Sequence, residues 1–142
     1  MMETLIEILH KGKHSLVVFN GEIHTYDSRG LSNLYHLYTT EPNILRDADI
    51  ADKVVGKGAA ALMVLGKVRS LHADVISNHA LKLLESSQIK ISYTQKVDNI
   101  INRQGTGICP VETQCLECKT AEECLPKITQ FISRLKTKTK ND

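Results

Sequence analysis

The chain has 142 residues, of which 18 are basic and 16 acidic, and its formal net charge is +2. A chain of this length buries roughly 70% of the surface that its unfolded form exposes, so we expect a single domain over 1–142. The near balance of charge creates no general field for nucleic acid or anionic lipid, so neither partner is expected. Residues 1–10 carry acidic side chains where a signal peptide is basic, and their apolar run is too short to span a bilayer. We therefore expect a cytoplasmic protein with reduced thiols.

The first part of the chain predicts a helix, a hairpin and a second helix. The first helix is amphipathic and runs from about Glu3 to His10. Strands at 15–19 and 22–26 flank Asn20-Gly21, which predicts a two-residue type I′ turn because both central residues of that turn need positive φ. The second helix lies near 31–38.

The second part predicts a buried helix and an alternation of strands with helices. The helix runs from about Asp52 to Leu65, and its small residues at 56–61 allow close approach to a sheet. Four further elements follow: a strand at 70–76, a helix at 78–85 capped by Ser77, a strand at 90–97 and a helical C-terminal region. The lysine-rich end, 136–142, predicts a frayed, solvated tail.

This order of elements, ββααβαβ after the first helix, predicts an α/β fold. Strands separated by helices favour parallel pairing, whereas the opening hairpin is antiparallel, so we expect a mixed sheet with helices on both faces, a three-layer sandwich. Ligands of such sheets bind beyond the carboxyl ends of the strands.

Three segments carry a resemblance to a known family. They are the hairpin followed by Leu-Tyr-His-Leu-Tyr-Thr, the run Asp-Lys-Val-Val-Gly-Lys-Gly-Ala-Ala-Ala at 52–61, and Gly-Ile-Cys-Pro-Val-Glu at 107–112. Together they resemble a bacterial and archaeal domain-of-unknown-function family with a cytidine-deaminase-like fold that lacks the usual zinc ligands. The resemblance spans nearly the whole chain. It implies ancestry in a nucleotide-modifying superfamily, whose members often associate, so a homodimer is the default expectation.

The residues themselves do not supply a zinc deaminase site. Such a site needs His or Cys two residues before a catalytic Glu, and a downstream Pro-Cys-x-x-Cys. The nearest match pairs His72-Ala73-Asp74 with Cys115-Leu116-Glu117-Cys118, where Asp replaces Glu and Gln114 stands in the place of proline. The resemblance aligns the helix near Asp52 with the first zinc-bearing helix of the superfamily, and this helix offers lysines instead of ligands. No metal or other cofactor is expected.

Lys53 and Lys57 are four residues apart in the predicted helix, so they share one face near its N-terminus. One interpretation is that they are solvated residues at the end of a buried helix. The other is an anion or phosphate pocket, because free N–H groups and ammonium groups at a helix start attract negative charge. In that second case Asp52 and Gly107 complete the candidate ligand-binding residues.

All four cysteines lie between positions 109 and 124. Cys109 precedes Pro110, which favours the first position of a helix, so Cys109 is a predicted N-cap where a thiolate is stabilised. Glu112 lies over the same turn, where it is a candidate cap, acid or base. The alternatives for Cys109 are a buried packing corner and, together with Cys115, Cys118 and Cys124, ligation of a metal.

Two functions from different classes remain open. The first is a module that binds a nucleotide or other phosphate-like small molecule at the start of the 52–65 helix, beside the loop at 105–112. The second is a metal-independent enzyme in which Cys109 attacks the substrate as a nucleophile and Glu112 moves a proton. Loss of activity or binding on replacing Cys109 with serine discriminates the two. Both place Lys53, Lys57, Cys109 and Glu112 around one concave site.

Overall fold

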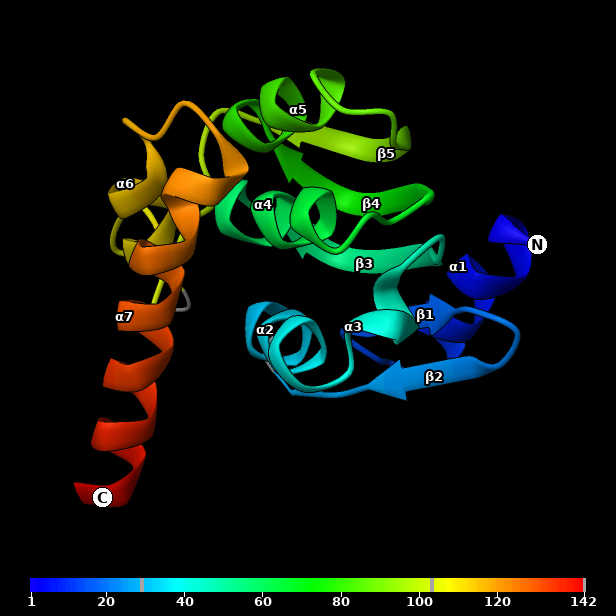
Figure 1. Cartoon of the computed structure of the whole chain (residues 1–142), viewed down its shortest axis with the longest axis horizontal. Coiled ribbons are helices and arrows are strands. Elements are labelled where there is room, and N and C mark those ends of the chain that lie inside the picture. The colour runs from blue at the N-terminus through cyan, green and yellow to red at the C-terminus, as the bar shows by residue number, and fades with distance from the viewer. Residues whose placement is uncertain (29, 103, 142) are drawn as a thin grey trace.

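The computed structural model describes residues 1–28, 30–102 and 104–141 and has one five-stranded sheet at its centre (Figure 1). The strands are β1 (Leu16–Phe19), β2 (Ile23–Tyr26), β3 (Asp49–Val55), β4 (Ser70–Ser77) and β5 (Lys90–Val97), in the spatial order β2-β1-β3-β4-β5. β1 pairs antiparallel with both β2 and β3, while β3, β4 and β5 are parallel. The predictions of a mixed sheet and of an antiparallel hairpin at its edge are therefore confirmed.

Helices cover both faces of the sheet. On one face α1 (Met2–Lys11) packs against β1 and β3 through a small cluster of buried side chains, Leu5, Leu9, Val17 and Ala51. The opposite face carries the larger core, which is formed with α2 (Gly30–Thr40), α3 (Pro42–Leu45), α4 (Lys57–Leu65) and α5 (Asn78–Glu85). The arrangement is consistent with the three-layer α/β architecture expected from the sequence.

Two C-terminal helices, α6 (Pro110–Cys115) and α7 (Ala121–Asn141), lie at the carboxyl ends of the parallel strands (Figure 1). The predicted tail at 136–142 coincides with the end of α7 as far as Asn141, and residue 142 lies outside the described residues.

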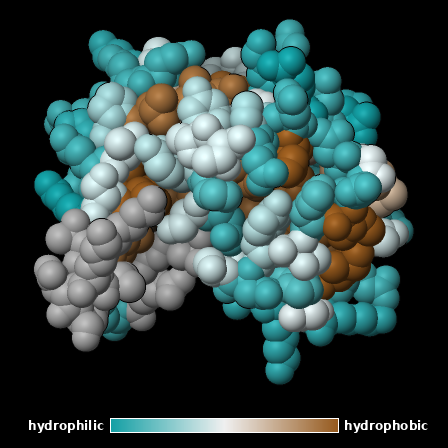
Figure 2. Space-filling model, turned by 60° about the horizontal axis from the view of Figure 1, so that its bottom comes forward, coloured by the Kyte–Doolittle hydropathy of each residue, from teal (hydrophilic) through white to brown (hydrophobic). Residues whose placement is uncertain are grey.

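No helix in the described part of the chain is both long enough and apolar enough to cross a bilayer. On the face that Figure 2 shows, hydrophilic residues predominate and hydrophobic residues appear only in separate places.

The prediction of one helix from Asp52 to Leu65 is wrong in its first part. Residues 49–55 form the central strand β3, Gly56 is the N-cap, and α4 begins only at Lys57. The strand was hidden because polar Asp52 and Lys53 interrupt its apolar residues, so that the run does not show the period of two that marks a strand. The remainder of the prediction is confirmed, because every residue of α4 from Lys57 to Met63 is buried.

The hairpin turn also differs from its prediction. Phe19 pairs with Ile23, so the loop has three residues and not two, and among them only Gly21 has a positive φ, of 78°. The Asn20 side chain is used differently, since its amide donates hydrogen bonds to the carbonyls of Asn43, Ile44 and Arg46 at 2.7, 3.1 and 3.0 Å. Asn20 therefore holds the hairpin against α3, a tertiary role that a local turn rule does not contain.

Candidate functional site

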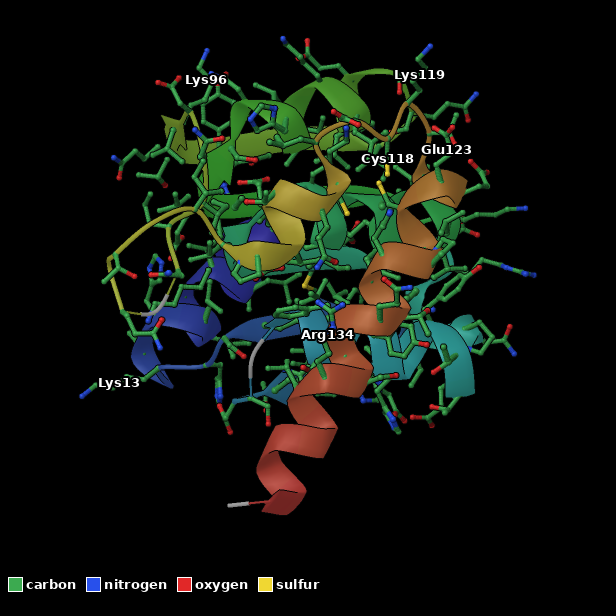
Figure 3. The ribbon with its side chains drawn as sticks, turned by 90° about the vertical axis from the view of Figure 1, so that its left-hand side faces the viewer. Lys13, Lys96, Cys118, Lys119, Glu123 and Arg134 are labelled. Carbon is green, nitrogen blue, oxygen red and sulfur yellow. The ribbon has the colours of Figure 1, made fainter. Side chains whose placement is uncertain are left out.

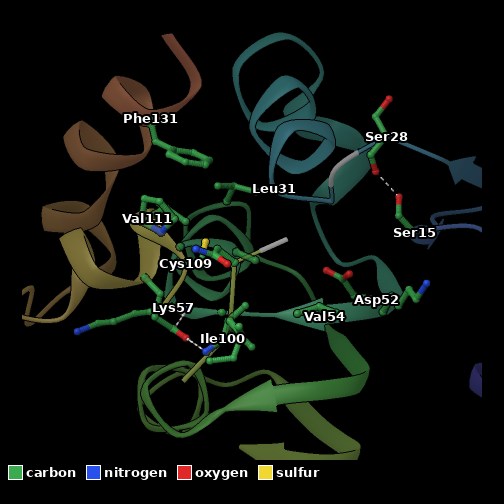
Figure 4. A pocket seen from close by; sticks show the side chains of 18 of the residues that line it. Ser15, Ser28, Leu31, Asp52, Val54, Lys57, Ile100, Cys109, Val111 and Phe131 are labelled. Atoms are coloured by element: carbon green, nitrogen blue, oxygen red, sulfur yellow. Dashed lines mark hydrogen bonds between the residues drawn. The ribbon is translucent and has the colours of Figure 1, made fainter. Parts of the chain in front are cut away.

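A cavity of about 600 Å³ lies at the carboxyl end of β3, between the start of α4, the loop at 100–109 and helices α2, α6 and α7 (Figure 4). Five of the six residues singled out from the sequence line this cavity: Asp52, Lys53, Lys57, Cys109 and Glu112. The sixth, Gly107, is exposed on the loop and is not part of the lining. The structure thus brings together residues that are more than fifty positions apart in the sequence.

Glu112 is a buried structural carboxylate. Its side chain is 1% exposed and accepts hydrogen bonds from the backbone N–H of Lys57 at 2.8 Å, the hydroxyl of Ser77 at 2.9 Å and the backbone N–H of Ile100. Ser77 in turn is the N-cap of α5, where its oxygen accepts from the N–H of Ala80 at 3.2 Å. One carboxylate therefore joins the starts of α4 and α5 to the loop before α6, as expected for an anion at a helix N-terminus.

This arrangement corrects the predicted role of Glu112 as a cap of its own helix. The side chain of Glu112 makes no capping bond within α6, and it caps α4 instead, 55 positions away. Glu112 is 1% exposed and its two oxygens accept three hydrogen bonds from the protein, which favours a structural role over proton transfer to a substrate.

Lys57 is directed away from the cavity, although its backbone lines it. Its ammonium donates to the carbonyl of Leu116, directly after α6, at 3.2 Å and to the carbonyl of Cys118 in the connection to α7. A cation at the C-terminal end of a helix compensates the partial negative charge of the free carbonyls there. The first N–H of α4 is also occupied, because it donates to Glu112.

The position of Lys53 also differs from the prediction. It lies on β3 and not on a helix, so Lys53 and Lys57 do not share a helical face near a free N-terminus. Successive side chains of a strand point to opposite faces, so the side chains of Lys53 and its neighbour Asp52 leave β3 on different sides. Lys53 is exposed, whereas Asp52 is buried. The physical basis that the sequence offered for an anion pocket, two lysines over a free helix start, is not present.

Asp52 is the most unusual group of the cavity. Its side chain is 1% exposed, and Figure 4 shows the carboxyl pointing into the cavity. No described residue gives a hydrogen bond to its Oδ2. Burial raises the pKa of Asp52 to about 8, and nearby Asp74 adds to the rise, while backbone N–H groups of Val54 and Lys53 oppose it. The carboxyl is therefore mainly protonated at neutral pH, and it can both donate and accept a hydrogen bond.

Cys109 occupies the position predicted for it. It is the N-cap of α6, with Pro110 in the first turn, and its backbone N–H donates to the carbonyl of Ile100 at 2.7 Å. The thiol is half-buried at the cavity wall (Figure 4). His14 also lines the cavity, but its ring is paired with the carboxylate of Asp27.

The walls of the cavity are largely apolar, and sequence reasoning missed them. Leu31 of α2, Val54 of β3, Val111 of α6 and Phe131 of α7 supply much of this surface. These residues belong to four different elements, so no local pattern of the sequence joins them. In the described part of the chain, no three His, Cys, Asp or Glu side chains are arranged to hold a metal ion.

The comparisons with known proteins agree on one family. The family model described as "Domain of unknown function (DUF1893)", with the name TM1506, matches residues 4–132, so the chain belongs to that family. The crystal structure of a DUF1893 family protein, TM1506, from Thermotoga maritima has a TM-score of 0.82 and 30% sequence identity. That similarity covers 94% of this chain and 88% of the other. No curated protein matches the sequence.

Proposed function

We propose that this member of the DUF1893 family binds a small molecule of nucleoside or nucleotide size in the cavity, with Asp52 as its polar anchor. The observation that carries the proposal is the buried carboxyl of Asp52, which points into a cavity of about 600 Å³ with one oxygen unpartnered among the described residues. A buried polar atom without a partner costs free energy unless a ligand satisfies it. Cavities that bind small molecules typically measure about 300–1,000 Å³.

The chemistry of the lining favours a planar heterocycle with a polar edge. A protonated carboxyl presents an O–H donor beside a C=O acceptor, and an amide or amidine edge of a nucleobase presents the matching acceptor and donor. Phe131 and Leu31 provide apolar surface for the face of such a ring. Lys13, an exposed lysine of the lining, meets the phosphate of a nucleotide in this proposal. Lys53 and Lys57 do not, because the side chain of Lys53 leaves β3 on the face opposite to Asp52 and the ammonium of Lys57 is bound to the end of α6.

A second candidate function is supported by the thiol of Cys109 at the cavity wall. In this alternative, Cys109 attacks a bound substrate as a nucleophile without a metal. The base in this alternative is not Glu112, because that side chain is 1% exposed and is held by three hydrogen bonds from the protein. Cys109→Ser separates the two candidates, since a binding module keeps its affinity and a thiol enzyme loses its activity.

The proposal also covers the ancestry, the cellular location, the oligomeric state and the partners of the protein. It includes a cytidine-deaminase-like ancestry, which the resemblance of the 52–61 and 107–112 segments implies. It also includes a cytoplasmic location, a homodimeric state and no nucleic-acid polymer as partner, which follow from the composition and the resemblance. Equilibrium sedimentation measures the oligomeric state directly.

The test is calorimetric titration of the purified chain with adenosine, cytidine, guanosine, uridine and their 5′-monophosphates. We expect at least one of these to bind, and Asp52→Ala to weaken that binding roughly tenfold, as for the loss of one or two buried hydrogen bonds. Asp52→Asn should retain most of the affinity, because an amide keeps one donor and one acceptor. Glu22→Gln, on the exposed turn of the hairpin, is the control and should bind as the wild type does.

The pH dependence of binding gives a second readout. Because the anchor is the protonated carboxyl, the affinity of the wild type should fall as the pH rises through about 8, the pKa of Asp52. Asp52→Asn should not show this fall. Absence of binding by all eight compounds at millimolar concentration, or affinity unaffected by Asp52→Ala, would contradict the proposal.

A further inference from the structure

Three cysteine thiols meet where α6 ends and α7 begins, outside the lining of the cavity. Cys115 is the last residue of α6, Cys118 lies in the connection, and Cys124 is in the first turn of α7. Cys115 and Cys124 are fully buried, whereas Cys118 is only half-buried and lies on the connection that Figure 3 shows beside Glu123. Of these three residues, only Cys118 is open to a reagent in solution.

The three sulfurs are in mutual contact through Cys124. The thiol of Cys124 shares a hydrogen bond with Cys115 and another with Cys118, and all three cysteines are free in the structure. Two thiols within hydrogen-bonding reach need little movement to come to the much shorter distance of a disulfide, and only five residues separate Cys118 from Cys124 in the sequence.

Positive charge is fixed next to this cluster. The ammonium of Lys57 donates to the carbonyl of Cys118 itself, and its charge favours the thiolate form of Cys115, Cys118 and Cys124. Burial opposes this effect and raises the pKa of Cys118. The hydrogen bond from Cys124 lowers the pKa of Cys115. A disulfide reacts with the thiolate, so the raised pKa of Cys118 slows the exchange, and it is the access of this thiol to solvent that permits it.

From this contact geometry we infer that Cys118 and Cys124 are a reversible redox pair that forms an intramolecular disulfide by exchange with a low-molecular-weight disulfide such as oxidised glutathione. In the first step the sulfur of Cys118 attacks one sulfur of the reagent, and one molecule of glutathione leaves with the proton of Cys118. In the second step the sulfur of Cys124 attacks the sulfur of Cys118, and the second glutathione leaves with the proton of Cys124. The two protein thiols are oxidised and one glutathione disulfide is reduced to two thiols, so electrons and protons balance.

The pairing follows from access and contact together. Cys118 is the half-buried thiol that the reagent reaches, and Cys124 is its direct neighbour behind it. Cys115 contacts Cys124 from the buried side and stays reduced in this scheme. Cys109 lies on the cavity wall at the other end of α6 and takes no part.

The experiment equilibrates the full-length chain with buffers of reduced and oxidised glutathione in the presence of a chelator, traps the free thiols by alkylation and maps the disulfides by mass spectrometry. We expect the wild type to fall from four free thiols to two and to yield a peptide pair that links Cys118 with Cys124. Dithiothreitol should restore all four.

Two variants serve as a matched comparison. Cys118→Ser should form no intramolecular disulfide, whereas Cys109→Ser should form the same linkage as the wild type. Circular dichroism confirms that each variant is folded, and the map of the wild type decides the pairing without any substitution. Four free thiols at every ratio of glutathione, a linkage that omits Cys118 or Cys124, or a product that stops at glutathionylated Cys118 would overturn the inference.

Discussion

Replacing Asp52 by asparagine tests whether the Asp52 carboxyl is protonated in the folded chain, and this test needs no knowledge of the ligand. In the folded chain the carboxyl of Asp52 has a pKa of about 8, against an ordinary value of 3.8. Between these two values the folded state holds a proton that the unfolded state has released. Stability therefore declines as the pH rises through this window, because the unfolded state binds fewer protons than the folded state. The contribution is fully present below about pH 4 and is lost by about pH 8.

The magnitude follows from the linkage relation. Each pH unit within the window lowers the free energy of unfolding by about 1.4 kcal/mol on account of this one group. Asparagine has nearly the same shape and does not titrate, so it removes that slope. The stability of Asp52→Asn relative to the wild type should therefore increase by about 2.7 kcal/mol between pH 5 and pH 7.

Urea denaturation followed by circular dichroism at pH 5, 6 and 7 measures this difference, and taking the variant against the wild type cancels the titration of all other groups. Glu22→Gln, which alters an exposed carboxylate, should leave the pH dependence of stability unchanged. A difference between Asp52→Asn and the wild type that is independent of pH, or that shrinks as the pH rises, would refute the assignment of a buried, protonated Asp52.

Three further predictions concern stability and metal content. Glu112→Ala should lower the free energy of unfolding by about 3 kcal/mol, since it removes the acceptor of the buried Lys57 N–H and Ser77 hydroxyl and of the half-buried Ile100 N–H. A loss under about 1 kcal/mol in urea denaturation would show that water replaces the carboxylate. Gly66→Ala should cost about 1–3 kcal/mol, because a Cβ there would lie 2.9 Å from Leu45 Cδ1 and 3.0 Å from the carbonyl of Leu62, and thermal unfolding measures it. Freshly purified protein should hold far less than one zinc or iron per chain by elemental analysis; one zinc per chain that disappears when the cysteines of the 115–124 cluster are replaced would restore the metal hypothesis.

Local rules predicted two helix N-caps of this fold correctly, although they did not predict the type of the hairpin turn. Cys109 is an N-cap because Pro110 cannot donate a backbone hydrogen bond and already has the φ of a first helical turn. Ser77 caps α5 for a comparable reason, since its hydroxyl accepts from the N–H three residues later. An N-cap depends on a few neighbouring residues, so it can be predicted from the local sequence alone.

The central strand could not be predicted in this way because its polar residues are explained only by distant partners. Asp49 is buried at the start of β3, and its carboxylate is held by the guanidinium of Arg69 at 3.0 and 2.6 Å and by Ser70. Asp52 is buried in the same strand and points into the cavity. Two buried acidic residues in one strand break the apolar pattern that marks a strand from sequence.

The candidate site was located from the sequence, but its chemistry was not. The resemblance implied that 52–57 and 109–112 lie together, and residues of both segments line the cavity. The sequence did not predict the contacts of Lys57, whose ammonium is bound to the end of α6, or of Glu112, which caps α4. Each of these contacts spans more than fifty positions, and no spacing rule reaches that far.

The burial of α4 has a consequence for how this family can vary. A helix with every residue from Lys57 to Met63 buried has no solvent-facing side on which substitutions are neutral. At Gly58 even a single methyl group would lie 3.3 Å from Val111 Cγ2 and 3.4 Å from Leu31 Cδ1, two side chains that wall the cavity. Larger residues in this segment should therefore require compensating changes in α2 and α6, so that relatives with a larger residue at one of these positions should carry a smaller residue facing it.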